Sequence, residues 1–218
     1  ILAHHMPWGK DKLTTIHKGH DPGWYQSIPR IERSSMGFNE KDILVCCVAN
    51  VRPFKGIPFL INATYSLPGE FPIHFLLIGN GYDVGTVKSL IVNSPIKDRI
   101  HILGFRKDSL SIVSASDATV LTSTHGEALT KSVIESMCLG IPPIITDIPG
   151  NKGLVIDKHS GWVVPPKNSL ALSAAILEMA SDKDERLQRG INAREHIRQH
   201  FNTAQTVKEF LQLYERLK

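Results

Sequence analysis

Short, continuous apolar runs alternate with segments whose apolar residues recur at helical spacing. The runs at residues 43–49 and 73–78 are typical of strands that are buried on both faces. Shorter apolar runs predict further strands at residues 100–103, 118–122, 143–146 and 161–164. Helices are expected at residues 56–67, 84–92, 131–139, 170–180, 185–200 and 203–217, and a shorter one capped by Asp108 and ending at Ala115. This alternation predicts an α/β fold with a doubly wound, mostly parallel, Rossmann-like sheet.

The first 33 residues lack any sustained periodicity. Glycine, proline and histidine are frequent there, so we interpret residues 1–33 as a linker or hinge, with at most a short strand at 13–16. The histidines at positions 4, 5, 17 and 20 match no standard ligand spacing, and no metal site is expected. We divide the remainder into a ligand-binding domain, residues 34–200, and a carboxyl-terminal helix, residues 201–218. The chain begins at Ile1, and its opening looks cut from something longer.

The composition is that of an ordinary soluble globular protein, with 42% hydrophobic and 21% charged residues in 218. The net charge of +4 suits an anionic ligand without requiring one. Cys46 and Cys47 are neighbours in an apolar run, and the cysteine count of three is odd, which favours reduced thiols in a reducing compartment. No apolar run has the length of a membrane span, and no signal peptide is evident.

Three polar stretches follow predicted strands, at residues 50–56, 79–81 and 123–130. Because ligands bind beyond the carboxyl ends of parallel strands, we expect these stretches to share one rim. Arg52 and Lys55 could clamp a diphosphate there, although basic residues at a strand end can also be simply solvated. Gly79-Asn80-Gly81 does not complete a dinucleotide fingerprint, because Val84 stands at its last position, so we favour a tight turn that also admits a ligand close to the backbone.

Two carboxylates stand out between residues 122 and 147. Glu127 lies in the loop and Glu135 on the following helix, with seven residues between them. Glu127 could accept a hydrogen bond from a sugar hydroxyl and Glu135 two from a ribose diol, whereas the alternative for Glu135 is a helix-surface carboxylate. Thr130 is a plausible N-cap, which would leave backbone N–H groups of Lys131 and Ser132 for an anion. A nucleotide sugar has both the hydroxyls and the phosphates that such a site would bind.

Other polar residues in this part of the chain have simpler interpretations. Asp117 and Asp147 flank strands and are expected to be turn and cap residues. His125 is expected to be a solvated loop histidine rather than a base.

With these residues in view, the chain resembles the carboxyl-terminal, donor-binding domain of retaining glycosyltransferases of family 4, the glycosyl transferases group 1, which have the GT-B fold. The resemblance covers roughly residues 40–200. It rests on the Glu-x7-Glu motif of Glu127 and Glu135 with the following Ser-Met-Cys-Leu-Gly-Ile-Pro, on residues 51–56 (VRPFKG), on residues 77–81 (LIGNG) and on residues 102–105 (ILGF). Residues 16–21 (IHKGHD) are similar to the family's crossing segment, with Lys18 in place of the usual asparagine.

The resemblance implies a role for each of these motifs. Arg52 and Lys55 would neutralise the leaving diphosphate, Glu127 would bind the donor sugar and Glu135 the ribose. The nucleotide base would meet the backbone at Gly104 and Phe105, and backbone N–H groups near Leu129, Thr130, Lys131 and Ser132 would meet the sugar and phosphate, beside Gly79 and Gly81. The donor substrate would be a nucleoside-diphosphate sugar, with no separate cofactor and no bound metal.

The chain departs from the family pattern in two respects. The usual Glu-Gly-Phe-Gly is replaced here by Glu127-Ala128-Leu129-Thr130, which narrows the freedom of the backbone. The acceptor-binding amino-terminal half is also absent from these 218 residues, so we expect a fragment that is inactive alone. The helix at 203–217 resembles one that packs toward that half, so its apolar face should be partly exposed here.

The resemblance implies a hexosyltransferase-type enzyme with a glycan or lipid-linked acceptor. It also implies a role in polysaccharide assembly in the cytoplasm or at the inner face of the membrane, as a peripheral protein with no nucleic-acid partner. Two alternatives stay open, namely a GT-B relative with other chemistry, such as a nucleotide-sugar epimerase, and a non-catalytic nucleotide-binding module.

Overall fold

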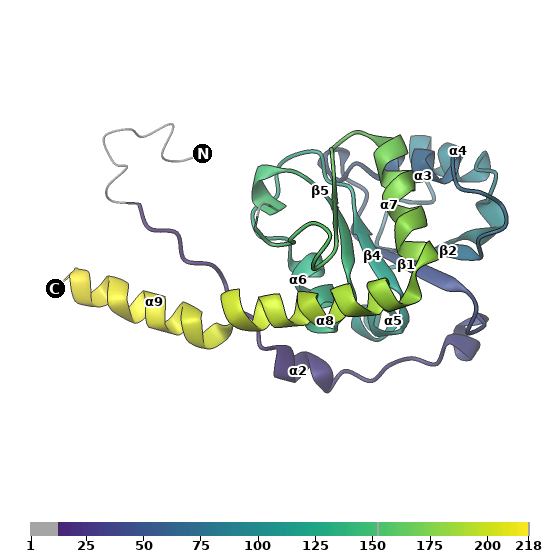
Figure 1. The fold of residues 1–218 in the computed structure, drawn as a ribbon. Helices are drawn as coiled ribbons and strands as arrows, with labels where there is room; N and C mark the ends of the chain where they lie inside the picture. The colour runs from purple at the N-terminus through teal and green to yellow at the C-terminus, as the bar shows by residue number, and fades with distance from the viewer. Residues whose placement is uncertain (1–12, 152, 218) are drawn as a thin grey trace.

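A parallel β-sheet forms the centre of the computed structural model, which describes residues 13–151 and 153–217 (Figure 1). Its strands are β1 (Ile43–Val48), β2 (Ile73–Ile78), β3 (Ile100–Gly104), β4 (Ala118–Leu121), β5 (Pro143–Thr146) and β6 (Trp162–Val164). Their order is β3-β2-β1-β4-β5-β6, and every neighbouring pair is parallel. The predicted doubly wound, Rossmann-like α/β fold is confirmed.

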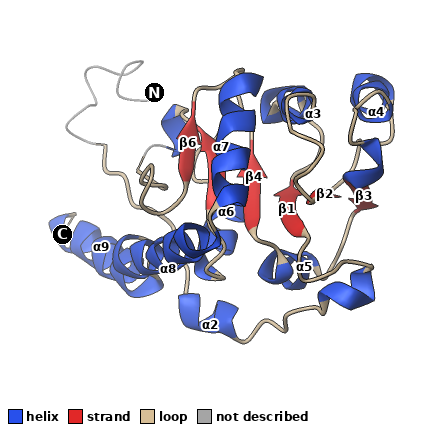
Figure 2. Cartoon of the chain, turned by 45° about the vertical axis from the view of Figure 1, so that its right-hand side comes forward, coloured by secondary structure: helices blue, strands red, loops and turns tan. Residues whose placement is uncertain are grey.

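Helices flank the sheet in two groups (Figure 2). In the first group, α3 (Ile57–Thr64) packs against α4 (Gly85–Val92) and α7 (Ser169–Ser181). In the second, α6 (Lys131–Cys138) packs against α5 (Ser109–Ala115) and α8 (Lys183–His200). Short 3-10 turns lie at Arg33–Met36, Pro53–Lys55, Lys97–Arg99 and Pro149–Asn151.

The central strands are buried on both faces, as their continuous apolar runs predict. In β1, Val45 and Cys47 belong to the larger core cluster, while Leu44 and Cys46 belong to a smaller cluster that includes residues of α5. Successive side chains of a strand point to opposite faces, so a strand with hydrophobic neighbours on both sides needs apolar residues throughout. Both cysteines of β1 are buried free thiols, and burial raises their pKa values.

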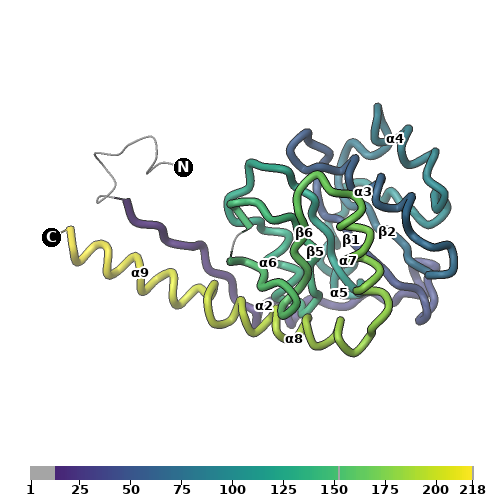
Figure 3. Tube along the Cα trace, turned by 45° about the horizontal axis from the view of Figure 1, so that its top comes forward, coloured from purple at the N-terminus to yellow at the C-terminus, as the bar shows by residue number. Residues whose placement is uncertain are grey.

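The segment before β1 differs in part from the expected linker. Residues 13–16 form no strand, so that expectation is wrong; instead, this stretch runs beside α9 (Thr203–Arg216), where the Thr206 hydroxyl donates to the His17 carbonyl (2.8 Å; Figure 3). A short helix, α2 (Pro22–Gln26), follows and packs against α6. His4 and His5 lie outside the described residues.

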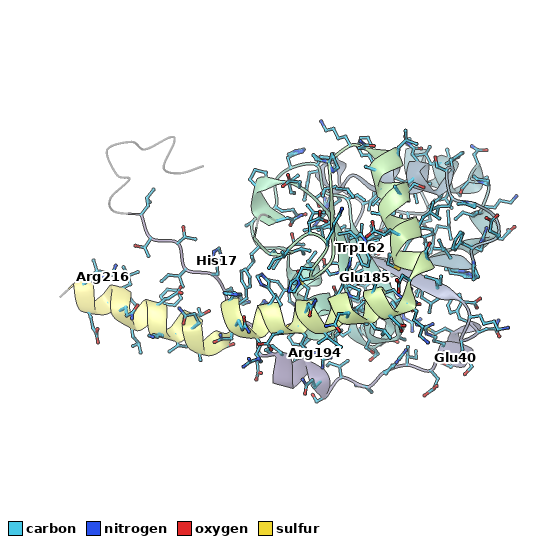
Figure 4. The ribbon with its side chains drawn as sticks, in the orientation of Figure 1. His17, Glu40, Trp162, Glu185, Arg194 and Arg216 are labelled. Atoms are coloured by element: carbon cyan, nitrogen blue, oxygen red, sulfur yellow. The ribbon has the colours of Figure 1, made fainter. Side chains whose placement is uncertain are left out.

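Helix α9 leads away from the sheet, and Arg216 lies at its far end (Figure 4). No residue of α9 is fully buried, and Val207, Phe210, Leu211 and Tyr214 are exposed, so the expectation of an exposed apolar face is confirmed. None of the helices in the described ranges is long and apolar enough to cross a membrane.

Asp117 corrects a second expectation, because it is more than a turn residue before β4. Its carboxylate accepts hydrogen bonds from Arg33 (3.0 Å), Arg186 (3.2 Å) and the backbone N–H of Leu44 (2.9 Å). Both arginine side chains are buried, and a buried charge requires a partner of opposite sign. Asp117 therefore joins the segment before β1, the start of β1 and α8 in one ion-pair cluster.

Asp108 corrects a third expectation. It precedes α5 at the N-cap position, yet its side chain makes no capping hydrogen bond. Arg106 donates two hydrogen bonds to the carboxylate instead, at 2.7 and 2.6 Å. Both carboxylate oxygens of Asp108 are therefore hydrogen-bonded to Arg106 and not to the amides of the helix.

Candidate functional site

The loops after β2, β1 and β4 lie on one rim of the sheet, because these three strands are neighbours and all are parallel. The connections run outward in opposite directions from β1 and β4, which makes this junction the topological switch point of the sheet. Ligands of doubly wound folds bind in the crevice at such a point. The stretches 50–56, 79–81 and 123–130 are therefore brought to the same edge.

The loops after β1 and β4 are joined by hydrogen bonds across the switch point. The backbone N–H of Thr124 donates to the carbonyl of Phe54 (2.7 Å), and the hydroxyl of Thr122 donates to the carbonyls of Lys55 (3.0 Å) and Gly56 (3.1 Å). Gly56 has φ +63°, and a Cβ there would lie 2.1 Å from the Thr122 carbonyl oxygen. Glycine is needed at position 56 for this close approach.

Lys55 and Glu127 form an ion pair between these two loops. Lys55 Nζ lies 2.6 Å from Glu127 Oε1, and the Ser123 hydroxyl donates to the same oxygen at 2.6 Å. Only 18% of the Lys55 side chain and 10% of the Glu127 side chain are exposed. The two residues expected to bind diphosphate and sugar are thus in direct contact, and each holds the other in a fixed position at the rim. Arg52, three residues before Lys55, is exposed at the N-cap position of the 3-10 turn.

Glu135 lies on α6, and its side chain is 17% exposed. Lys131, one turn earlier, approaches the carboxylate at 3.2 Å but is itself 72% exposed. Such a pair contributes little to stability, since exposed ion pairs are worth about 0–1 kcal/mol. Glu135 is therefore held near the surface by a partner that a ligand could displace.

The start of α6 differs from the expected cap. Thr130 occupies the N-cap position, but its side chain makes no capping hydrogen bond to the helix. Its hydroxyl donates to the side chain of Asn151 (2.9 Å), which lies in the turn after β5. The amides of Lys131 and Ser132 therefore do not donate to the Thr130 side chain, whereas those of Val133 and Ile134 donate to the Thr130 carbonyl (3.2 Å each). Leu129, just before the cap, is half-buried and packs against the core.

Gly79 is required by backbone crowding. It has φ +134°, and a Cβ there would lie 2.3 Å from the Ala49 carbonyl oxygen. Its N–H donates to the Gly104 carbonyl (2.8 Å), which links the ends of β2 and β3. The backbone carbonyl of Asn80 accepts a hydrogen bond from the N–H of Val51 (2.8 Å), so the turn at 79–81 is also bonded to the loop after β1.

The end of β3 presents an open surface. Among the described residues, no neighbouring atom lies within 4 Å of the position that a Cβ would take at Gly104, and Phe105 is 70% exposed. Two strand spacings of about 4.8 Å separate β3 from β1, so roughly 10 Å lie between these strands. A ligand that contacts both Phe105 and Lys55 would have to be elongated. Gly81, also at this rim, has φ +96°.

The segment 18–25 lies beside α6, which the sequence pattern did not predict. Burial and the nearby charge of Glu135 raise the pKa of Tyr25 to about 12. Burial, followed by the positive charges of Lys18 and Lys131, lowers the pKa of His20, whose ring nitrogen lies 3.0 Å from the Tyr25 hydroxyl. Tyr25 therefore lies within electrostatic reach of the Glu135 carboxylate, and His20 within reach of Lys131, both of which are on α6.

Metal-ligating side chains do not gather at this rim. Within residues 13–151 and 153–217, no group of three or more histidine, cysteine, aspartate or glutamate residues is placed to hold a metal ion. His125 is exposed, and its ring nitrogen lies 2.8 Å from the Thr124 hydroxyl.

The fold and this charged rim define a Rossmann-like ligand-binding domain. The sequence identifies the family as well: the model of the family "Glycosyl transferases group 1" matches residues 30–196, so the chain belongs to that family.

Curated relatives are similar over most of the chain. An uncharacterized glycosyltransferase of Methanocaldococcus jannaschii is 28% identical over 94% of this chain and 53% of its own length. The N-acetyl-alpha-D-glucosaminyl L-malate synthase of Bacillus anthracis is 22% identical over 84% of this chain and 48% of its own length. The chain thus spans about half the length of these relatives.

Solved structures share the fold. The Anabaena protein HepE, crystallised with UDP, superposes with a TM-score of 0.82 at 22% identity, over 93% of this chain and 57% of that one. A glycosyltransferase from Rickettsia africae superposes with a TM-score of 0.84 at 20% identity, over 95% of this chain and 57% of that one. At this level of identity the likeness establishes the GT-B type of fold alone.

Proposed function

We propose that this chain is the donor-binding half of a retaining, family 4 glycosyltransferase of the hexosyltransferase type, which moves a sugar from a nucleoside diphosphate to a glycan or lipid-linked acceptor. The observation that carries the proposal is the Lys55–Glu127 ion pair at the switch point, on the loop that leads into α6, the helix that carries Glu135. Cations, sugar-binding carboxylates and free amides are the groups that a nucleotide sugar requires. HepE, which has the same fold, was crystallised with UDP-glucose.

Each residue has a role in this proposal. Lys55 and Arg52 balance the negative charge that grows on the diphosphate as the bond between sugar and phosphate breaks. Glu127, oriented by Lys55 and Ser123, accepts a hydrogen bond from a hydroxyl of the donor sugar. The ribose hydroxyls displace Lys131 from Glu135 and donate hydrogen bonds to its carboxylate.

The remaining contacts are made by the backbone and by Phe105. The backbone amides of Leu129 to Ser132 meet the phosphates and sugar, and Gly79 and Gly81 let the ligand lie close to the rim. The base lies at Gly104 and Phe105. The diphosphate charge is balanced by protein cations, and neither a metal nor a separate cofactor is required.

The proposal assigns only half of the reaction to this chain. The acceptor would bind a preceding domain, for which residues 1–33 form the connection, residues 34–200 the donor domain and residues 201–218 the returning helix. This half alone would not transfer sugar. We place the whole enzyme in the cytoplasm, at the inner face of the membrane as a peripheral protein, in polysaccharide assembly.

Calorimetric titration with UDP, GDP, ADP and dTDP tests the proposal. We expect one nucleotide to bind, and Lys55→Ala and Glu135→Gln to weaken it. A hydrogen bond to a charged group is worth about 1.5–3 kcal/mol, or roughly 10- to 150-fold in Kd.

Matched controls come from exposed residues before β3 and before β2, at the opposite edge of the sheet. Lys97→Ala and Glu70→Gln should bind like wild type. Absence of binding for all four nucleotides, or equal affinity in the rim and control variants, would contradict the proposal. In the full-length enzyme, the anomeric configuration of the product, read by NMR, tests retention.

A further inference from the structure

Asn151 is a polar side chain in a nearly closed environment, with 2% of its surface exposed. Its Nδ2 donates to the Thr146 carbonyl (3.2 Å), and its Oδ1 accepts from the Thr130 hydroxyl (2.9 Å). The Thr146 hydroxyl in turn donates to the Ser123 carbonyl. Three consecutive hydrogen bonds thus join Ser123 to Thr130, which are the two ends of the loop that carries Glu127.

The turn that contains Asn151 also contacts the middle of the loop at residues 123–130. A Cβ at Gly150 would lie 1.9 Å from the Glu127 carbonyl oxygen, so the two backbones are in direct contact. Thr130, Thr146 and Asn151 are all buried, and a buried polar group that loses its partner costs free energy. The loop is therefore held at both ends and in the middle by the last residue of β5 and the turn that follows it.

The bond to Asn151 has a specific effect on Thr130. A threonine at an N-cap normally accepts a hydrogen bond from an amide of the first helical turn. Here the hydroxyl is directed to Asn151, and no capping bond forms on α6. Asn151 therefore holds the Thr130 hydroxyl in an orientation in which it does not accept from an amide of α6.

We propose that Asn151 is a positioning residue for donor binding: by holding the Thr130 hydroxyl away from the start of α6, it leaves the amides of Lys131 and Ser132 for an anionic group of the nucleotide. The inference rests on the proposed function, since it assumes that those amides meet the donor. It assigns the role to the side chains of Asn151 and Thr130 without requiring that either side chain touch the ligand.

The test compares nucleotide affinity in variants of these two positions, with the nucleotide that binds wild type among UDP, GDP, ADP and dTDP. Asn151→Ala releases the Thr130 hydroxyl to cap α6, and we expect Kd to rise about tenfold, the equivalent of ~1.4 kcal/mol. Adding Thr130→Val removes the hydroxyl, so the double variant should recover an affinity within about twofold of the Thr130→Val single variant. Adding Thr130→Ser keeps a hydroxyl, and that double variant should stay weak.

The recovery by valine distinguishes positioning from general stabilisation. If Asn151 only supported the fold, a second substitution in its network would leave binding as weak or make it weaker. Thermal unfolding followed by circular dichroism establishes that each variant is folded, and Asn151→Ser replaces Asn151→Ala in the same comparison if the alanine variant does not fold.

Three outcomes would overturn the inference, and they differ in whether the proposed function also fails. If wild type binds a nucleotide but Asn151→Ala binds it equally well, or Thr130→Val fails to restore binding, then Asn151 has no positioning role and the proposed function stands. If wild type binds none of the four nucleotides, the proposed function fails, and this role of Asn151 fails with it.

Discussion

Replacing Asp117 by asparagine should destabilise the fold strongly, because it leaves two buried guanidinium groups without their common carboxylate. The side chains of Arg33 and Arg186 are 8% and 7% exposed. Breaking a buried ion pair by removing one partner costs about 3–5 kcal/mol. Arg33 keeps bonds to the carbonyls of Ala115 and Asp42, and Arg186 keeps one to Met179, so we expect the lower end, ~3 kcal/mol.

Urea and thermal unfolding, followed by circular dichroism, measure this loss. For a chain of this size, 1 kcal/mol shifts Tm by about 2–4 °C, so Asp117→Asn should lower Tm by roughly 6–12 °C. The matched control is Asp108→Asn, which removes a carboxylate from an exposed pair with Arg106, with side chains 42% and 40% exposed. That pair should be worth about 0–1 kcal/mol. Equal losses in the two variants would refute the assignment of Asp117 as the centre of a buried cluster.

Two further predictions concern pH and backbone crowding. Burial lowers the pKa values of His74 and His101 below 6.5, so the unfolded chain binds more protons than the folded one, and the free energy of unfolding should fall as pH drops from 7.5 to about 5.5. His101→Gln should weaken this pH dependence in urea unfolding. An unchanged slope of stability against pH in this variant would contradict the prediction. Gly79→Ala should cost about 1–3 kcal/mol in the free energy of unfolding, because it combines φ +134° with a contact of 2.3 Å to the Ala49 carbonyl oxygen. Gly69→Ala meets no atom within 4 Å in the described part of the chain, and it should cost less than about 0.5 kcal/mol in the same assay.

The elements with strong local patterns could be predicted from the sequence. The bounds of β2 and β5 match the predicted runs, because continuous apolar residues between turn residues leave little room for another register. The parallel, doubly wound sheet followed from the alternation of strands and helices, and the strand order of the structure brings the loops after β1, β2 and β4 to the expected common rim. Helix α2, with five residues, is too short to show a helical period, and it was missed.

The polar contacts of the site could not be predicted in the same way. Lys55 and Glu127 were each assigned to a ligand, and nothing in their local sequence indicates that they pair with each other across 72 positions. The same holds for Asn151, whose partner Thr130 is 21 positions away, and for Asp117, whose arginines lie on either side of it in the chain at distances of 84 and 69 positions. Hydrogen-bond partners far apart in sequence leave no periodic signal, so only the fold reveals them.

The hydrogen bonds between the loops after β1 and β4 have a consequence for the thermodynamics of ligand capture. Thr122 and Thr124 hold the backbone of residues 54–56 in place before any ligand is present. A ligand that binds there meets a preorganised surface, and it does not have to order a loop at a cost in conformational entropy. Mutations that cut these bonds should therefore reduce affinity through a less favourable binding entropy, even though neither threonine carries a charge.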